Sequence, residues 1–141
     1  MLGGSEMSVA SLTVCVWSSQ ARQDSIIEKP LWAEIEQSIR GLNNADRNDI
    51  YLYPTMEAPE TWLAVGGGNG SYVVTGSIDA ERHPFLPNVA GSETEFVELC
   101  VGGQVGEYPS RQVVSLESTL CAVNRFYEAG GFDCGVVWEF S

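Results

Sequence analysis

The only histidine of the chain, His83, follows Asp79 and Glu81 at short spacing. A histidine close to two carboxylates has the chemistry to bind a metal ion or to carry out general acid–base catalysis. The same residues stand before Pro84 in a polar stretch, and this context favours a solvent-exposed loop. No G-x-S-x-G, H-x-E or H-E-x-x-H motif accompanies them. A small-molecule enzyme that uses His83 is therefore one hypothesis, and a solvated loop is its alternative.

The glycine-rich segment 66–70 is the second motif whose residue types suggest chemistry. A phosphate-binding loop presents backbone N–H groups at the start of a helix, and the Walker form adds a lysine. Here a β-branched run follows the glycines, and no lysine is near. We therefore predict a hairpin turn in which Asn69 and its glycine neighbours adopt positive φ. The Gly102–Gly103 pair is likewise predicted to be a bend or bulge, because no dinucleotide-binding fingerprint follows it.

Acidic residues are concentrated in one part of an acidic chain. The sequence holds 19 Asp and Glu against 7 Lys and Arg, a formal net charge of −12. This balance argues against direct binding to nucleic acid or to an anionic membrane. Between residues 79 and 107 one arginine accompanies six carboxylates: Asp79, Glu81, Glu93, Glu95, Glu98 and Glu107. We expect either a surface complementary to a basic protein partner or an ordinary solubilising face.

Apolar and aromatic residues qualify this picture. Phe85 and Leu86 interrupt the polar segment between two prolines. They have the character of an interface anchor ringed by charge, and they are equally able to fold back onto the sheet as a lid. Tyr51, Tyr53 and Trp62 are expected to be mainly core or sheet-face residues, since aromatic side chains dominate core packing.

The length of 141 residues predicts a single domain over 1–141, with residues 1–7 as a loose N-terminal tail. No apolar run reaches the ~18 residues of a transmembrane helix. The beginning of the chain lacks the basic region of a signal peptide, so we expect a cytoplasmic protein.

The four cysteines, by the same compartment argument, are expected to be reduced thiols. Their spacing contains no C-x-x-C pair, so no zinc site is predicted. Cys15 and Cys121 stand among apolar neighbours and are expected to be small core residues.

Hydrophobic periodicity predicts two helices. The first has Pro30 at its first helical position and presents one apolar face, made of Trp32, Ile35, Ile39 and Leu42. The second runs from an N-cap at Ser115 to Gly130–Gly131. Its predicted inner face is Leu116, Leu120, Val123 and Tyr127, with Phe126 at the side.

Alternating apolar residues and turn signals predict the strands. They fall at 11–17, 49–53, 61–65, 71–75, 94–101 and 136–140, with a short extended piece at 111–114. Residues 18–28 and 79–93 are expected to be loops. Successive strands with short connections favour an antiparallel meander. The predicted class is α+β: a mainly antiparallel sheet of about five to seven strands with two helices packed against it.

The last third of the chain resembles a known family in the order of its motifs. These are Phe96-Val97-Glu98-Leu99, Gly102-Gly103-Gln104, Tyr108-Pro109, Val113-Val114-Ser115, then Ala122, Arg125-Phe126-Tyr127 and Gly130, and finally Val137-Trp138. The Trp32 helix, Leu52 and the strands at 63–65 and 73–76 extend the match over most of residues 28–140. The pattern is similar to that of the first family of polymorphic-toxin immunity proteins, which includes inhibitors of bacterial nucleic-acid deaminase toxins.

The resemblance implies a cytoplasmic antitoxin that is not an enzyme and that occludes the site where a cognate toxin domain acts. We expect no cofactor, no metal and no direct contact with nucleic acid or membrane, and we favour a monomer in a 1:1 complex. The residues themselves, not the family motifs, suggest the toxin-binding set: Asp79, Glu81, His83, Phe85, Leu86, Glu93, Glu95, Glu98 and Glu107. The alternatives are a secretion adaptor or chaperone that binds an effector without inhibiting it, and the His83 enzyme.

Overall fold

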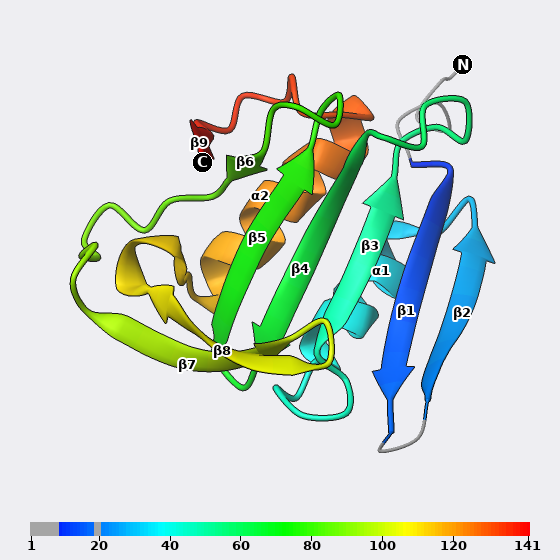
Figure 1. Ribbon diagram of the computed structural model, residues 1–141. Coiled ribbons are helices and arrows are strands. Elements are labelled where there is room, and N and C mark those ends of the chain that lie inside the picture. Colours follow the sequence, from blue (N-terminus) through cyan, green and yellow to red (C-terminus); the bar gives the residue numbers. More distant parts are fainter. Residues whose placement is uncertain (1–8, 19–20) are drawn as a thin grey trace.

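The β-branched runs of the sequence form one antiparallel sheet of seven strands, in the order β2-β1-β3-β4-β5-β6-β9 (Figure 1). The computed structural model describes residues 9–18 and 21–141, so the predicted tail at 1–7 lies outside the described residues. The strands of this sheet are β1 (Ser11–Trp17), β2 (Arg22–Glu28), β3 (Asp49–Tyr53), β4 (Trp62–Gly68), β5 (Ser71–Ser77), β6 (Pro84–Phe85) and β9 (Glu139–Phe140). A separate two-stranded sheet consists of β7 (Phe96–Val101) and β8 (Gln104–Pro109).

Two helices, α1 (Trp32–Arg40) and α2 (Leu116–Ala129), cover one face of the seven-stranded sheet (Figure 1). The predicted caps of α2 are confirmed: the Ser115 hydroxyl accepts a hydrogen bond from the Ser118 N–H, and Gly130 ends the helix at φ 73°. The expectation that Pro30 is the first helical residue is wrong. The N-cap of α1 is Leu31, whose N–H donates to the Glu34 carboxylate at 2.8 Å. The α+β class is confirmed.

The main core lies between the sheet and the two helices. Alternate residues of the central strands point to the helices because side chains of a strand alternate between its faces. Fully buried members of this core are Leu12, Ile35, Ile39, Ile50, Leu52, Leu63, Val65, Val74, Val123 and Phe126. Phe126 was expected at the side of the α2 inner face, but it is 0% exposed, whereas Leu116, Leu120 and Tyr127 are only partly buried. Phe126 also contacts Phe132 edge-on at 5.0 Å, which ties the C-terminal segment to α2.

Three strands lie where none was predicted, namely β2, β6 and β8. The two-residue β6 falls in the segment 79–93, which was expected to be a loop, and it pairs with β5 through Thr75↔Phe85 because the buried Phe85 packs back onto the sheet. The segment 18–28 was expected to be a loop, yet β2 pairs with β1 over seven residues, from Ser11↔Glu28 to Trp17↔Arg22. β2 escapes recognition because it is an edge strand with almost every residue exposed, so its sequence carries no buried alternation. Of the two structures expected for the Gly102–Gly103 pair, a bend or a bulge, the bend is observed: with φ 63° and 79°, the pair forms the turn of a hairpin that joins β7 to the unpredicted strand β8.

Three further boundaries differ from the predictions. Only Asn69 and Gly70 form the turn between β4 and β5, because Gly66, Gly67 and Gly68 continue β4. The expected extended piece at 111–114 is a 3₁₀ turn over Ser110–Gln112, followed by a single bridge between Val114 and Tyr72. The predicted last strand at 136–140 is reduced to two residues, Glu139–Phe140.

The cysteines behave differently from one another. All four are free thiols, and Cys15 is buried as expected, but Cys121 is exposed on α2, so its assignment to the core is wrong. Burial raises the pKa of the Cys15 thiol to about 12.

Neither helix formed by the described residues is long and apolar enough to cross a lipid bilayer.

We predict that Phe126→Ala lowers the free energy of unfolding by about 3–5 kcal/mol, because it removes a fully buried ring from the centre of the core. The matched control is Phe96→Ala, since Phe96 is 55% exposed on β7; we expect it to change stability by less than about 0.5 kcal/mol. Urea unfolding followed by tryptophan fluorescence measures both. Equal losses for the two variants would contradict the assignment of the core.

Candidate functional site

The β7–β8 hairpin crosses the sheet face opposite the helices, over β4 and β5 (Figure 1). Its inner side is apolar: Leu99 is 2% exposed and packs with Val73 of β5 and with Val113, and three partly buried residues complete the cluster, namely Val97, Val101 and Tyr108. Because side chains alternate along a strand, the intervening residues of β7 and β8 must point away from the sheet. The hairpin therefore presents a second, outward face to solvent.

The outward face of the hairpin is acidic at its centre and apolar at its ends. Glu98 and Glu107 are directly opposite each other in the register, and both are exposed. Within the described part of the chain, neither carboxylate forms a salt bridge. Phe96 and Val105, which are 55% and 68% exposed, lie on the same face. We name Phe96, Glu98, Val105 and Glu107 the acidic hairpin face.

Two asparagines of the α1–β3 connection hold the tip of the hairpin. Asn44 accepts a hydrogen bond from the Cys100 N–H at 2.6 Å, and Asn48 accepts one from the Gly103 N–H at 3.1 Å. Asn48 is fully buried, so its amide is fixed in place. These contacts join residues more than fifty positions apart in the sequence. The acidic hairpin face is thus a held surface rather than a free arm.

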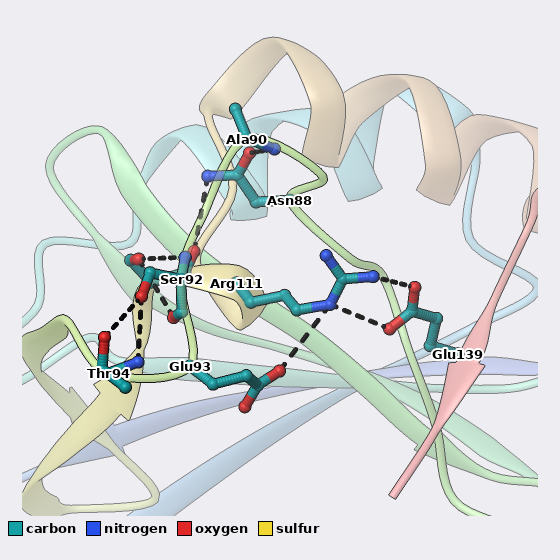
Figure 2. Close-up of polar contacts among 8 residues, drawn as sticks. Asn88, Ala90, Ser92, Glu93, Thr94, Arg111 and Glu139 are labelled. Atoms are coloured by element: carbon teal, nitrogen blue, oxygen red, sulfur yellow. Dashed lines mark hydrogen bonds and ion pairs between the residues drawn. The ribbon is translucent and has the colours of Figure 1, made fainter.

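Arg111 organises the loop that leads into β7 (Figure 2). Its guanidinium donates to the Glu139 carboxylate through Nε at 3.2 Å and through Nη2, and its Nε lies 3.7 Å from the Glu93 carboxylate. Arg111 thus connects the loop before β7 to β9 at the end of the chain. Glu93 is consequently partly neutralised, whereas Glu95 is exposed and forms no salt bridge among the residues described.

Backbone-directed hydrogen bonds hold the same loop. Ser92 and Ser110 are doubly linked, because the Ser92 N–H donates to the Ser110 hydroxyl and this hydroxyl donates to the Ser92 carbonyl. The Ser92 hydroxyl accepts from the Thr94 N–H at 2.9 Å (Figure 2). The Asn88 amide donates to the Val113 carbonyl at 3.0 Å. These hydrogen bonds therefore fix the position of Glu95 and Phe96 at the start of the hairpin.

The segment around His83 lies elsewhere. Asp79, Glu81 and His83 follow the end of β5, at the opposite end of that strand from the β4–β5 turn (Figure 1). Asp79 accepts from the N–H groups of Glu81 and Arg82 and pairs with the Arg82 guanidinium at 3.0 Å. These hydrogen bonds, the one from the Arg82 backbone first, lower the pKa of Asp79. Asp79 acts as a turn cap, and these three residues do not join the acidic hairpin face.

Phe85 and Leu86 fold back onto the sheet, which decides between the two alternatives left open by the sequence. Phe85 is 8% exposed and pairs with Thr75 of β5, and the Leu86 N–H donates to the Val74 carbonyl at 2.9 Å. Neither is an exposed anchor. The exposed apolar residues beside the carboxylates are instead Phe96 and Val105, which sequence analysis did not single out. If β8 had been predicted as a strand, the alternation of side chains along it would have placed Val105 and Glu107 together on the outward face.

A second cluster, which the sequence did not indicate, lies on the same sheet face beside the tip of the hairpin, where Gly103 packs against the Trp17 ring. The Trp17 indole donates to the Asp49 carboxylate at 2.9 Å, and the Arg22 guanidinium lies 5.4 Å from the Trp17 ring and 6.0 Å from the Tyr51 ring. Tyr51 also contacts Trp62 edge-on at 5.7 Å. Burial raises the pKa of Tyr51 to about 12. Tyr51 and Trp62 are therefore partly buried sheet-face residues, as expected.

In residues 9–18 and 21–141, no group of three or more His, Cys, Asp or Glu side chains is arranged to hold a metal ion. Two surface cavities have a volume of about 430 Å³ each. One of them lies along α2, beside Cys121 and Arg125.

No protein-family model, curated protein or solved structure matches the chain. The acidic hairpin face combines exposed apolar side chains with two carboxylates that have no basic partner among the described residues.

We expect Arg111→Ala to destabilise the protein by about 1–2 kcal/mol, because it removes charge-assisted hydrogen bonds from a partly buried carboxylate. Amide hydrogen exchange of residues 88–95 should accelerate more than that of β1. The control is Arg40→Ala, which breaks the exposed Arg40–Glu36 pair on α1 and should cost no more than about 0.5 kcal/mol. If both variants leave exchange in the 88–95 loop unchanged, Arg111 does not organise it.

Proposed function

We propose that the chain is a cytoplasmic immunity protein, an antitoxin that binds and inhibits a cognate bacterial toxin enzyme. The observation that carries the proposal is the acidic hairpin face, in which two opposed carboxylates without basic partners among the described residues stand between exposed apolar side chains. The target is a toxin that acts on nucleic acid, a deaminase by preference. The net charge of −12 supports this assignment.

The charge arrangement suits competition with a nucleic acid. An enzyme that binds nucleic acid presents basic side chains to the phosphates, and this positive groove is present before any substrate binds. A carboxylate pair on a fixed hairpin offers that groove negative charge without the cost of ordering a loop on binding. Long-range attraction raises the association rate, so the inhibitor reaches the groove quickly. The toxin is then blocked because its substrate path is occupied.

The apolar ends of the face supply the second part of the interaction. Glu98 and Glu107 repel each other in the free protein, since like charges directly opposite on neighbouring strands are destabilising. A basic side chain that inserts between them relieves this repulsion. Phe96 and Val105 then lose their exposure against the rim of the groove, which adds hydrophobic stabilisation to the electrostatic attraction. Opposite charge thus guides the complex, and apolar contact prolongs it.

Inhibition is tested with the product of the neighbouring gene, taken as the candidate toxin domain. The two proteins are co-purified, and deamination of a labelled oligonucleotide is measured with and without a stoichiometric amount of the chain. We expect a stable 1:1 ratio of the two chains and loss of deamination. A complex that leaves the toxin fully active would overturn inhibition and favour a secretion adaptor. The absence of any complex would overturn the proposal as a whole.

Charge reversal locates the interface. We expect Glu98→Lys combined with Glu107→Lys to lower kon for the toxin by about tenfold or more at low salt, with a smaller effect as salt screens the attraction. The variant replaces two opposed negative charges by two opposed positive charges, so the repulsion between the two side chains stays similar and folding should be retained. The control is Glu57→Lys with Glu60→Lys on the exposed β3–β4 connection, which makes the same change in net charge. Equal losses for the two variants would mean that only net charge matters.

A further inference from the structure

Among the described residues, β2 forms one edge of the seven-stranded sheet over its whole length. It bonds to β1 along one side for seven residues, and among the described residues no strand pairs with its other side. The opposite edge of the sheet ends in β9, which is only two residues long. An unpaired edge is a template for another strand unless a proline, a bulge, charged side chains or a covering segment blocks it. β2 contains no proline or glycine, and its register with β1 is unbroken.

The charges of β2 are self-complementary in an antiparallel arrangement. Its sequence, Arg-Gln-Asp-Ser-Ile-Ile-Glu, has Ser25 at the centre. When two copies pair antiparallel about Ser25, Arg22 of each lies opposite Glu28 of the other, which gives two opposite-charge pairs by symmetry. Residues directly opposite point to the same face of a continuous sheet, so only shifts by two residues are alternatives.

The two neighbouring registers are unfavourable. Pairing about Asp24 sets that carboxylate against its own copy. Pairing about Ile26 sets Asp24 against Glu28 of the other copy and leaves Arg22 without an opposite residue. Like charges directly opposite are destabilising, whereas opposite charges stabilise a strand pair. The register about Ser25 alone pairs all seven residues of β2 without such a conflict.

We infer that a second copy of this chain docks on β2, in antiparallel register about Ser25, so that the two sheets become one continuous sheet. Ile26, which is 66% exposed, then lies diagonal to Ile26 of the other copy, at the ~7–8 Å that diagonal neighbours have across a strand pair. Its exposed surface becomes covered. In the single chain the Arg22 guanidinium lies 5.4 Å from the Trp17 ring and 6.0 Å from the Tyr51 ring, so it must turn away from these rings and toward the edge to meet Glu28 of the other copy.

The rest of the fold leaves room for this pairing. The two β1 strands would be three strand spacings apart, about 14 Å, so the helices behind them do not meet. The acidic hairpin face lies over β4 and β5 and stays exposed in both copies (Figure 1). Charges around the edge balance, with Arg22 and Lys29 against Asp24 and Glu28. The edge is consequently suited to its own copy rather than to a strongly basic partner.

The test is sedimentation equilibrium of the purified chain over two orders of magnitude in concentration, at physiological ionic strength. We expect a monomer–dimer equilibrium in the micromolar range, because one strand pair makes a small interface. Arg22→Glu and Glu28→Arg should each raise the dimer Kd about tenfold or more, since each sets two like-charge pairs opposite one another. The combined variant should restore association. Arg125→Glu on α2, with the same change in charge as Arg22→Glu, is the control and should have little effect.

Cross-linking tests the register itself. In a Cys121→Ser background, Ser25→Cys should form a disulfide-linked dimer on mild oxidation, because each introduced thiol faces its own copy. Gln23→Cys is the matched control: it faces Ile27 of the other copy and should cross-link poorly. A chain that is monomeric at every concentration, a combined charge variant that fails to associate, or equal cross-linking at positions 25 and 23 would each overturn the proposal. Toxin inhibition is measured separately, so a failure of dimerisation and a failure of inhibition can be told apart.

Discussion

The β7–β8 hairpin packs against the main sheet only because β4 has no side chain at Gly66. A Cβ at that position would lie 2.5 Å from Val101 Cγ1, far inside van der Waals contact. Two residues further, Gly68 has φ 138°, and a Cβ there would lie within 2.6 Å of the Asn43 and Asn44 nitrogens. The C-terminal end of β4, which lacks side chains at Gly66 and Gly68, therefore contacts the hairpin on one face of the sheet. It also contacts the α1–β3 connection.

Orientation of the acidic residues follows from this packing. Leu99 is fixed beneath the hairpin, so the register of β7 and β8 is fixed too, and every second residue points to solvent. A slip by one residue would bury Glu98 and expose Leu99, at a cost far above the repulsion between two exposed carboxylates. The fold thus holds an unfavourable charge pair at the surface, because the apolar side of the same strands dictates it. A surface that is costly in the free protein and relieved by a cation suits a binding role.

A helix or strand could be predicted from the sequence where its own residues carry a local signal, such as a cap or an alternation of buried and exposed side chains. α2 was predicted almost to the residue because Ser115 and Gly130 cap it through local chemistry. β2 was missed because an exposed edge strand lacks buried alternation, and β8 was missed because the glycine pair before it was not recognised as a hairpin turn. Glu98 and Glu107 were recognised by composition, but their opposition required the register. Arg111 and Glu139 are 28 positions apart, and no local pattern signals that they meet.

The negative net charge affects the two proposed surfaces, the acidic hairpin face and the β2 edge, in opposite ways. A charge of −12 attracts a basic groove from a distance and makes two copies of the chain repel each other. Self-association is therefore confined to an edge whose own charges balance, and it is held to low affinity by the rest of the molecule. A basic toxin bound at the hairpin would reduce that repulsion and so tighten the dimer. By linkage, the dimer must then bind the toxin more tightly by the same factor. Two sites on separate parts of one sheet would be coupled through electrostatics alone, without any change of shape.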